Sequence, residues 1–363
     1  MNKRILTGAL TALSLLAVGA QAHASTLTQN LSWTIDRAGT STKYRVVAYG
    51  DSIYAGYNTG LFSIALFAAP TVDADYLQTK WKVDMDIQRR CKSGAVASDV
   101  YNNKIVSEKS YMQATNTRVV TFEMCGNDGL QARSSFKGQS GTCNYGVMDT
   151  ALNNCTTYQQ KAMQYINANA YSGTKVKAIA NLYYPGYAAD NVKSTCKDAT
   201  TGATINLRDK FLPYIAKMNW RACNFANTYG FKCQDNFAMF MGADYDSNGD
   251  GQVDSDALKY VQGESEAAYV TRITSTLKST IRDSNTHYAS ASTTYDYIQS
   301  DDTHPTYDGG DVSTGIIPGG TASGSSTPDF TDSQYVGGKN PNWNKYGHER
   351  MGWGLSLFNP TAP

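Results

Sequence analysis

Short runs of β-branched and apolar residues alternate along the chain with longer stretches of helical periodicity. The short runs predict strands at residues 45–49, 81–87, 118–124, 177–183 and 236–241. Helical patterns lie around residues 150–170, 207–228 and 264–282, and an amphipathic pattern returns at 346–357. This alternation predicts a parallel sheet with helices on both faces, in which sites form beyond the carboxyl ends of the strands. The apolar and polar residues alternate within 81–87, which places that strand nearer an edge of the sheet.

Two stretches break the alternation. Residues 244–256 are dense in Asp, Asn and Gly, and residues 308–342 are rich in Gly, Ser, Thr and Pro without periodicity. We interpret the second stretch as a long surface loop, part of an insertion over 308–345, because the amphipathic pattern resumes after it. Loops of this length are usually functional or mobile.

The first 24 residues have the pattern of a secretory signal peptide. Lys3 and Arg4 precede an uncharged apolar run, and two small-x-small sequences end at Ala22 and Ala24. The competing interpretation is an N-terminal membrane anchor. We expect a mature chain of residues 25–363 that folds as one domain, without a transmembrane segment, and is secreted or periplasmic.

Charge and composition exclude several classes of protein. The chain has 32 basic against 31 acidic residues, and without Lys3 and Arg4 the balance is 30 against 31. This near-neutral balance gives no electrostatic reason to expect nucleic-acid binding. Hydrophobic residues make up 41% and charged residues 17%, a composition that argues against disorder.

The chain has seven cysteines, which in an exported protein are expected to form disulfides and leave one thiol over. Cys143 and Cys155 could close one short loop, and Cys223 and Cys233 another. The remaining three are Cys91, Cys125 and Cys196. A zinc site is the competing interpretation, although the sequence has no C-x-x-C pair to support it.

Gly50-Asp51-Ser52 follows the first predicted strand. A Ser at a strand-to-helix turn lies at the positive end of the following helix, which favours developing negative charge. Taken alone, the tripeptide is equally typical of a helix cap. Three further segments follow in order: Ser93-Gly94-Ala95 after strand 81–87, Gly126-Asn127-Asp128 after strand 118–124, and Asp301-Asp302-Thr303-His304-Pro305 near the C-terminus.

These four segments together resemble the SGNH, or GDSL-type, serine hydrolase family. The resemblance implies an α/β fold, a three-layer α/β/α flavodoxin-like parallel sheet with long loop insertions. It also implies that Ser52 is the nucleophile, His304 the general base and Asp301 the residue that orients the imidazole. The oxyanion hole would consist of the Ser52 amide, the Gly94 amide and the Asn127 side chain.

Some residues depart from the family pattern or compete for these roles. The family's third motif is Gly-x-Asn-Asp, whereas Gly126 here stands directly before Asn127. Asp302 is the rival to Asp301, which has the family's spacing to the histidine. His287 and His348 are the other histidines of the mature chain, and we expect a surface or capping role for the first and a structural role for the second.

The acidic stretch resembles an EF-hand-type calcium loop. Oxygen ligands alternate over residues 246–250, Gly251 stands at the turn position, and Ala257 occupies the place of the usual final Glu. The candidate ligands are Asp246, Asn248, Asp250, Gln252, Asp254 and Asp256. We expect a structural calcium ion here, and no cofactor for catalysis. An Asp/Asn/Gly-rich surface turn is the alternative.

The sequence thus predicts an exported serine esterase or lipase that hydrolyses carboxylic esters through an acyl-Ser52 intermediate. Its partner would be a small-molecule or lipid ester. A polysaccharide O-acetyl esterase of the same mechanism, acting on an acetylated glycan, is the first alternative. A non-catalytic, calcium-stabilised binding protein on the hydrolase scaffold is the second.

Overall fold

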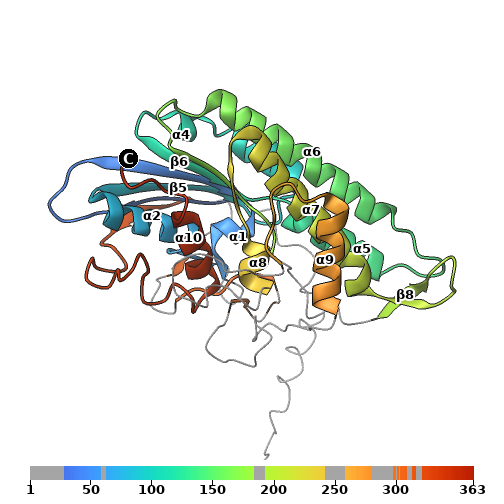
Figure 1. Cartoon of the computed structure of the whole chain (residues 1–363). Helices are drawn as coiled ribbons and strands as arrows, with labels where there is room; N and C mark the ends of the chain where they lie inside the picture. The colour runs from blue at the N-terminus through green and yellow to red at the C-terminus, as the bar shows by residue number, and fades with distance from the viewer. Residues whose placement is uncertain are drawn as a thin grey trace, which may run out of the picture.

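The centre of the molecule is a seven-stranded sheet with the order β10-β7-β6-β2-β5-β1-β12 (Figure 1). The computed structural model describes residues 28–58, 63–183, 193–241, 258–278, 297–299, 301, 303–308, 313–315 and 321–363. The strands of the sheet are β1 (Thr28–Ile35), β2 (Lys43–Gly50), β5 (Asp84–Lys92), β6 (Thr117–Phe122), β7 (Val176–Ala180), β10 (Lys232–Gln234) and β12 (Thr321–Ser326). A second sheet contains β3 (Tyr57–Asn58), β4 (Ser63–Ala65) and β11 (Ser313–Gly315). A third sheet contains β8 (Lys193–Lys197) and β9 (Thr204–Asn206).

Five strands of the sheet are parallel and have flavodoxin-like topology. Numbered along the chain, β2, β5, β6, β7 and β10 stand in the order 2-1-3-4-5, with every neighbouring pair parallel. After β2 the chain continues to β5 on one side of the β2–β6 pair, whereas after β6 it continues to β7 on the opposite side of that pair. The predicted parallel α/β sheet is therefore confirmed, and its switch point lies between β2 and β6, where such sheets place their sites.

Helices cover both faces of the sheet (Figure 1). They are α1 (Ser52–Ala55), α2 (Ala69–Trp81), α3 (Ala97–Asp99), the π-helix η1 (Val100–Val106), α4 (Ser110–Gln113), α5 (Gly126–Lys137), α6 (Gly146–Asn169), α7 (Leu207–Tyr229), α8 (Asn236–Met241), α9 (Glu266–Lys278) and α10 (Gly347–Ser356). Right-handed crossovers in opposite directions place α2 on one face and α6 with α7 on the other. The last helix, α10, packs on α2. The helices predicted from periodicity match α6, α7, α9 and α10.

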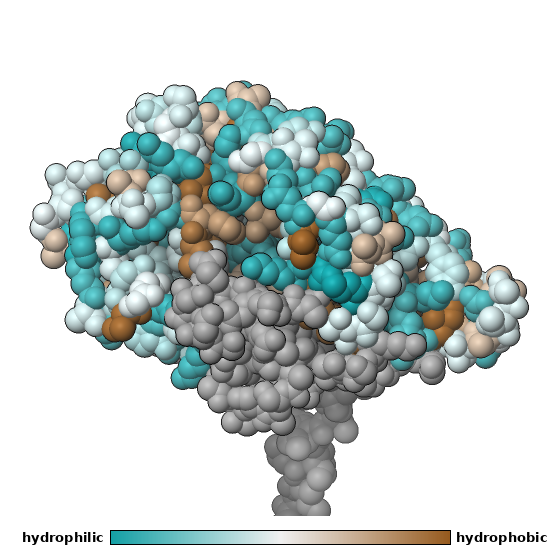
Figure 2. Space-filling model, in the orientation of Figure 1, coloured by the Kyte–Doolittle hydropathy of each residue, from teal (hydrophilic) through white to brown (hydrophobic). Residues whose placement is uncertain are grey.

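The core consists of strand residues buried between these layers. Val46, Val47, Ile87, Val120 and Ile179 are all fully buried, because strands covered on both faces carry continuous apolar runs. On the face shown in Figure 2, the described surface is mainly hydrophilic, with hydrophobic residues in small groups. Among the described residues, no helix combines the length and the apolar character that a membrane span requires.

Two of the predicted strands are placed differently in the structure. The segment 236–241 is the helix α8, and the edge strand β10 lies just before it. A short apolar run fits a buried helix as well as a strand, so periodicity could not separate the two. Trp81 ends α2, and β5 begins three residues later at Asp84. The strand β5 is also interior rather than near an edge, since β2 and β1 flank it.

The insertion is not a structureless surface loop throughout. Its segment β12 pairs in parallel with β1, which itself runs antiparallel to β5, and its segment β11 pairs with β4. The strand β12 has the sequence TASGSS and is mostly exposed, so it carries no apolar pattern. Its Gly324 is required for close packing, because a Cβ there would lie 2.5 Å from a ring carbon of Trp33.

Three disulfides join the described cysteines in a pattern that is only partly the expected one. The pair Cys223–Cys233 is confirmed, but Cys143 bonds to Cys196 and Cys155 to Cys125. The expected Cys143–Cys155 pairing is wrong. Cys155 lies nine residues inside α6, which at 1.5 Å per residue is roughly 14 Å from its start, whereas Cys143 precedes the helix. Cys91 is buried and free.

Several sequence predictions fall outside the described residues. These are the signal peptide of residues 1–24, the acidic loop 244–256 with all six candidate calcium ligands, Asp302 and His287. They stay predictions.

Candidate active site

The sharp turn after β2 positions Ser52. The strand β2 ends at Gly50, and Asp51 caps the short helix α1 by accepting a hydrogen bond from the Ile53 amide at 2.9 Å. Ser52 is therefore the first residue of α1, at the carboxyl edge of the sheet. The Ser52 side chain is 4% exposed, so most of its surroundings are protein rather than water.

Ser52, His304 and Asp301 form one chain of hydrogen bonds. The Ser52 hydroxyl lies 2.8 Å from Nε2 of His304, and the other ring nitrogen, Nδ1, bonds to Oδ2 of Asp301. The other Asp301 oxygen accepts from the backbone amides of Thr303 and His304 at 3.1 and 3.0 Å. Asp301 is thus fixed by its own loop, and it in turn fixes the imidazole with Nε2 facing the serine.

The charge of Asp301 is stabilised in this position. Burial by itself would raise the pKa of the Asp301 carboxyl, but the hydrogen bond from the His304 ring lowers that pKa below its ordinary value. Asp301 is therefore ionised at neutral pH. An ionised carboxylate at Nδ1 holds the imidazole in the tautomer whose Nε2 can accept a proton.

Asn127 lies where the ends of β2, β5 and β6 meet. Its Nδ2 donates to Oδ2 of Asp51 at 3.0 Å and to the carbonyl oxygen of Ala95 at 3.1 Å. Asp51 directly precedes Ser52, and Ala95 directly follows Gly94, whose φ is +73°. Asn127 thus bridges the residues next to Ser52 and Gly94, the other two predicted oxyanion residues.

Cys125 explains how the departure from the family motif is accommodated. It occupies the position of the family's first glycine and has a φ of +88°, in the left-handed region that glycine normally supplies. The loop therefore keeps the glycine-like backbone that leads Asn127 into α5. The following Asp128 accepts from the Ala97 amide at 2.7 Å, which ties α5 to α3.

Sequence analysis missed two side chains of the site. The ring of Tyr57 lies 4.6 Å from the His304 imidazole, centroid to centroid, at an angle of 43°. Glu123 directly follows β6 and accepts from the Asp51 amide at 2.6 Å. A signal for Glu123 was present in the sequence, since it is the one charged residue within the run Val119–Met124. Nothing in the local pattern pointed to Tyr57.

His348, the competing histidine, is in the protein interior. Its Nδ1 accepts from the Ala69 amide at 3.3 Å, and it is fully buried at the start of α10. Burial lowers the pKa of His348 to about 3, helped by the positive charges of Arg89 and His304. A neutral, buried histidine that joins α10 to α2 fits the predicted structural role.

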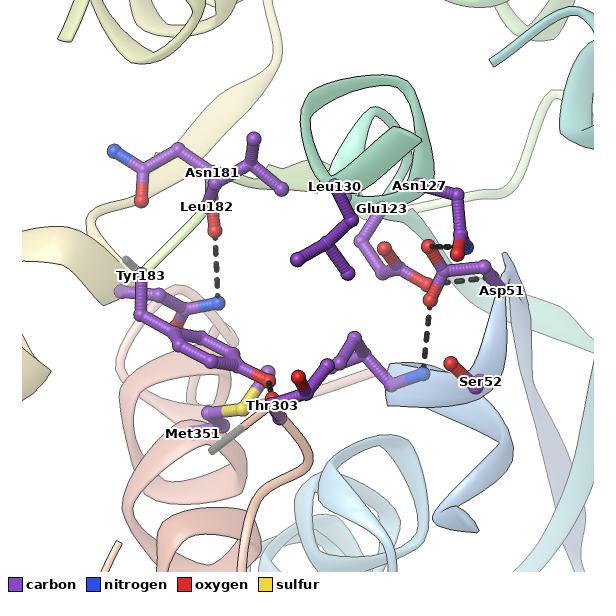
Figure 3. Close-up of a pocket in the computed structure, with 13 residues that line it drawn as sticks. Asp51, Ser52, Glu123, Asn127, Leu130, Asn181, Leu182, Tyr183, Thr303 and Met351 are labelled. Carbon is purple, nitrogen blue, oxygen red and sulfur yellow. Dashed lines mark hydrogen bonds between the residues drawn. The ribbon is translucent and has the colours of Figure 1, made fainter. Parts of the chain in front are cut away.

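A pocket opens beside Ser52. Figure 3 shows Ser52 and Asp51 at one side of it and Tyr183 and Met351 at the opposite side, with Leu130 between them. Ile53 and Leu182 also line it, whereas Asn181, Asn236 and Thr303 add polar atoms. Its walls come from α1, α5, α8, α10 and the segment after β7. In the part of the chain that the structure describes, no cluster of three or more His, Cys, Asp or Glu could hold a metal ion.

Comparison with known proteins gives a likeness of fold. No protein-family model and no curated protein matches the chain. Among solved structures it is similar to a lipase from a goat rumen metagenome, with 20% identity over 56% of this chain and 87% of that chain and a TM-score of 0.41. It is also similar to an extracellular lipase from Streptomyces rimosus, with 15% identity over 62% of this chain and 92% of that chain and a TM-score of 0.38. A third similar structure is an acetylxylan esterase from Geobacillus stearothermophilus, with 12% identity over 56% of this chain and 80% of that chain and a TM-score of 0.34.

The chain resembles the SGNH, or GDSL-type, hydrolases. It does so in the 2-1-3-4-5 strand order of its parallel core and in the order of its motif residues along the chain. Identity to these solved structures is 20% or less, so the function has to be argued from the geometry of the site itself.

Proposed function

We propose that the protein is an exported serine esterase that acts through an acyl-Ser52 intermediate. The observation that carries this proposal is the continuous hydrogen-bonded chain from the Ser52 hydroxyl through His304 to Asp301. A serine hydroxyl is a weak nucleophile until a base within hydrogen-bond reach removes its proton. Nε2 of His304, at 2.8 Å, has the position that this transfer requires.

Each step of the proposed reaction moves one proton through His304. Ser52 Oγ attacks the ester carbonyl while its proton passes to Nε2, and the tetrahedral intermediate carries the negative charge on the former carbonyl oxygen. When the intermediate collapses, the bond to the alcohol oxygen breaks and Nε2 returns the proton to that oxygen. Water then attacks the acyl-serine in the same way, releasing the carboxylic acid and restoring the Ser52 hydroxyl.

The Ser52 amide, the Gly94 amide and the Asn127 side chain are our candidates for the oxyanion hole. The Ser52 amide lies at the N-terminus of α1, and Asn127 bridges the residues next to Ser52 and Gly94. Preorganised donors of this kind stabilise developing charge, and each contributes roughly 3–4 kcal/mol by deletion.

The pocket supports an acyl group longer than acetyl. Ile53, Leu130, Leu182 and Met351 give it apolar walls directly beside the nucleophile. Burial of apolar area is worth about 0.8 kcal/mol per methylene, so such walls favour substrates with longer acyl chains. We therefore place lipid or short-chain acyl esters before acetylated polysaccharides as substrates.

Export is supported by the three disulfides. Structural disulfides persist in oxidising compartments such as the periplasm and the cell exterior. This agrees with the predicted signal peptide of residues 1–24.

The deciding experiment is labelling with a fluorophosphonate probe, read by mass spectrometry of the labelled peptide. We expect one label on Ser52 in the wild-type protein and none in Ser52→Ala. A chain-length series of acyl esters, assayed beside an acetylated glycan, then separates the two substrate classes. Esterase activity that survives in Ser52→Ala would refute the mechanism, and an unlabelled, inactive wild type would favour the non-catalytic binding protein.

A further inference from the structure

Two carboxyl side chains lie against each other beneath the nucleophile. Glu123 and Asp51 are 3% and 1% exposed, and Oε1 of Glu123 accepts from the Asp51 amide at 2.6 Å. Gly50 makes room for this arrangement, because a Cβ at that position would lie 2.3 Å from Oε1 of Glu123. Figure 3 shows both carboxyl groups at the Ser52 side of the pocket.

Within the described part of the chain, the pair has no ion-pair partner to balance two negative charges. Among the described residues, no Lys or Arg forms an ion pair with Asp51 or Glu123. Two carboxylates in contact and out of water cannot both ionise at neutral pH, so they hold one proton between them. Burial, followed by the charge of Asp51, raises the pKa of Glu123 well above its ordinary value, which assigns the proton to Glu123.

Asp51 connects this pair to the proposed oxyanion hole. An amide NH₂ has two hydrogens. In the structure those of Asn127 go to Oδ2 of Asp51 and to the carbonyl of Ala95, so to serve an oxyanion the amide has to turn the second hydrogen from Ala95 toward the substrate while the first stays on Asp51. Asp51 therefore sets the orientation of the Asn127 amide. The same carboxylate accepts from the Ile53 amide, so it also holds the turn on which Ser52 lies.

We propose that Glu123 is a positioning residue for catalysis: in its protonated form it donates to Asp51, and Asp51 in turn holds the Asn127 amide at the oxyanion site. This inference rests on the proposed function of Ser52 and Asn127. A protonated Glu123 leaves a single charge on the pair. Loss of its proton would place a second buried negative charge next to the atom on which the oxyanion forms, and would strengthen the hold of Asp51 on Asn127.

We therefore expect the activity to decrease at alkaline pH, as Glu123 loses its proton. The titratable groups that face the pair are His304, Asp128, Tyr54, Cys91 and Tyr183. Asp128 titrates on the acid side, because burial raises its pKa only to about 6. Burial raises the pKa of Cys91 to about 12 and keeps both tyrosines neutral. Glu123 is thus the group of this set that can account for an alkaline decrease.

The test compares Glu123→Gln with Glu123→Leu. Glutamine reproduces the protonated carboxyl, since its oxygen can accept from the Asp51 amide and its NH₂ can donate to the Asp51 side chain. Leucine removes both contacts. We expect Glu123→Leu to lower kcat roughly 10- to 100-fold with little change in KM, and Glu123→Gln to recover most of that loss. We also expect the alkaline decrease in kcat to disappear in Glu123→Gln.

Infrared spectroscopy supplies a readout that does not depend on activity. The difference spectrum of wild type minus Glu123→Gln at neutral pH should show the absorption of one protonated carboxyl group, because the other buried acids, Asp73 and Asp75, contribute equally to both proteins. Glu266→Gln is the matched control, because Glu266 pairs with Arg221 on α7, away from the site, and it should change neither the spectrum of protonated carboxyls nor the pH profile.

Three results would overturn the inference. One is a difference spectrum of wild type minus Glu123→Gln without a protonated-carboxyl band, and another is a wild-type alkaline limb in Glu123→Gln. If Glu123→Leu fails to fold, these two measurements still decide. The third is unchanged activity in Ser52→Ala. That result would refute the proposed function, and the role of Glu123 at the oxyanion site would be refuted with it. The first two results, by contrast, contradict only the inference about Glu123.

Discussion

The disulfide between Cys125 and Cys155 ties the loop that carries Asn127 to the middle of α6. Cys125 has a left-handed backbone conformation that costs a non-glycine residue of the order of 1–3 kcal/mol. The bridge thus holds the backbone in place two residues before the proposed oxyanion donor. A glycine could adopt this conformation freely, and here a covalent bond stabilises it instead.

The first prediction separates the bridge from the backbone conformation. The double variant Cys125→Ala/Cys155→Ala should lose about 3 kcal/mol of unfolding free energy and roughly tenfold in kcat, because neither bridge nor glycine supports the loop. Cys125→Gly/Cys155→Ala should lose similar stability but retain more kcat. Equal kcat in the two variants would show that the left-handed conformation does not matter for catalysis. Loss of the distant Cys143–Cys196 bridge is the control and should leave kcat unchanged.

The second prediction concerns Asp301. Asp301→Asn should keep the loop but replace the acceptor at Nδ1 of His304 with a group that can favour the wrong tautomer. We expect kcat to fall by about 10³- to 10⁴-fold, with the folded structure intact by circular dichroism. Asp308→Asn, on the same segment, is the comparison and should lose far less. A small effect at Asp301 would redirect attention to Asp302.

Removing the Asn127 side chain is the third test. Asn127→Ala should lower kcat by about 10²- to 10³-fold and leave KM nearly unchanged, because the amide is expected to act in the transition state. Asn169→Ala is the matched control, since that amide donates to the Tyr165 carbonyl in the last turn of α6. A rise in KM without a fall in kcat would instead indicate a ground-state binding role for Asn127.

The fourth prediction uses a buried acid outside the site. Burial raises the pKa of Asp73 to about 7, although Asn359 donates to its Oδ1 at 2.7 Å. The folded state therefore keeps a proton that the unfolded state releases above pH 4, so this group lowers stability as pH rises from about 4 to about 7. The loss should approach about 4 kcal/mol for a shift of this size.

Urea unfolding of Asp73→Asn at several pH values measures this effect. The difference in unfolding free energy between the variant and the wild type should grow in favour of the variant between pH 4 and pH 7. His348 acts in the opposite direction below pH 6.5, because its neutral form is buried, but its contribution cancels in the difference. A difference that stays constant with pH would mean that Asp73 ionises normally.

The fifth prediction concerns the acidic loop, and it rests on the sequence alone. We propose that residues 246–256 bind a structural calcium ion. Chelation should then lower the melting temperature, and added calcium should restore it, without abolishing hydrolysis below the transition. Asp250→Asn should weaken the response to calcium. A melting curve that neither chelator nor calcium moves would leave the loop as a surface turn.

The sequence predicts the parallel core and the meeting of Ser52 with His304 because both depend on local signals. Strand 45–49 has a buried apolar pattern, and the turn at Gly50 follows it directly. The motif residues then meet because parallel strands end at one edge of the sheet. Their order along the chain was enough to predict that Ser52 and His304, 252 residues apart, would be neighbours.

What the sequence did not predict depends on contacts between distant segments. The strand β12 is polar and mostly exposed, so only its pairing with β1 defines it as a strand. The partner of Cys155 follows from the packing of α6 against α5, which spacing along the chain does not encode. Tyr57 reaches His304 only because the chain turns back after α1 at Gly56, which has a φ of +74°.

The pairing of β1 with β12 also constrains the order of folding. Thr28–Ile35 is the first described strand, and its parallel partner Thr321–Ser326 is nearly three hundred residues later. An emerging chain thus has one edge of β1 unpaired until the residues through Ser326 have been made. Contacts of such large sequence separation form slowly, because the loop entropy is lost before the contacts form. The N-terminal strand is therefore completed late, together with the segment that follows His304.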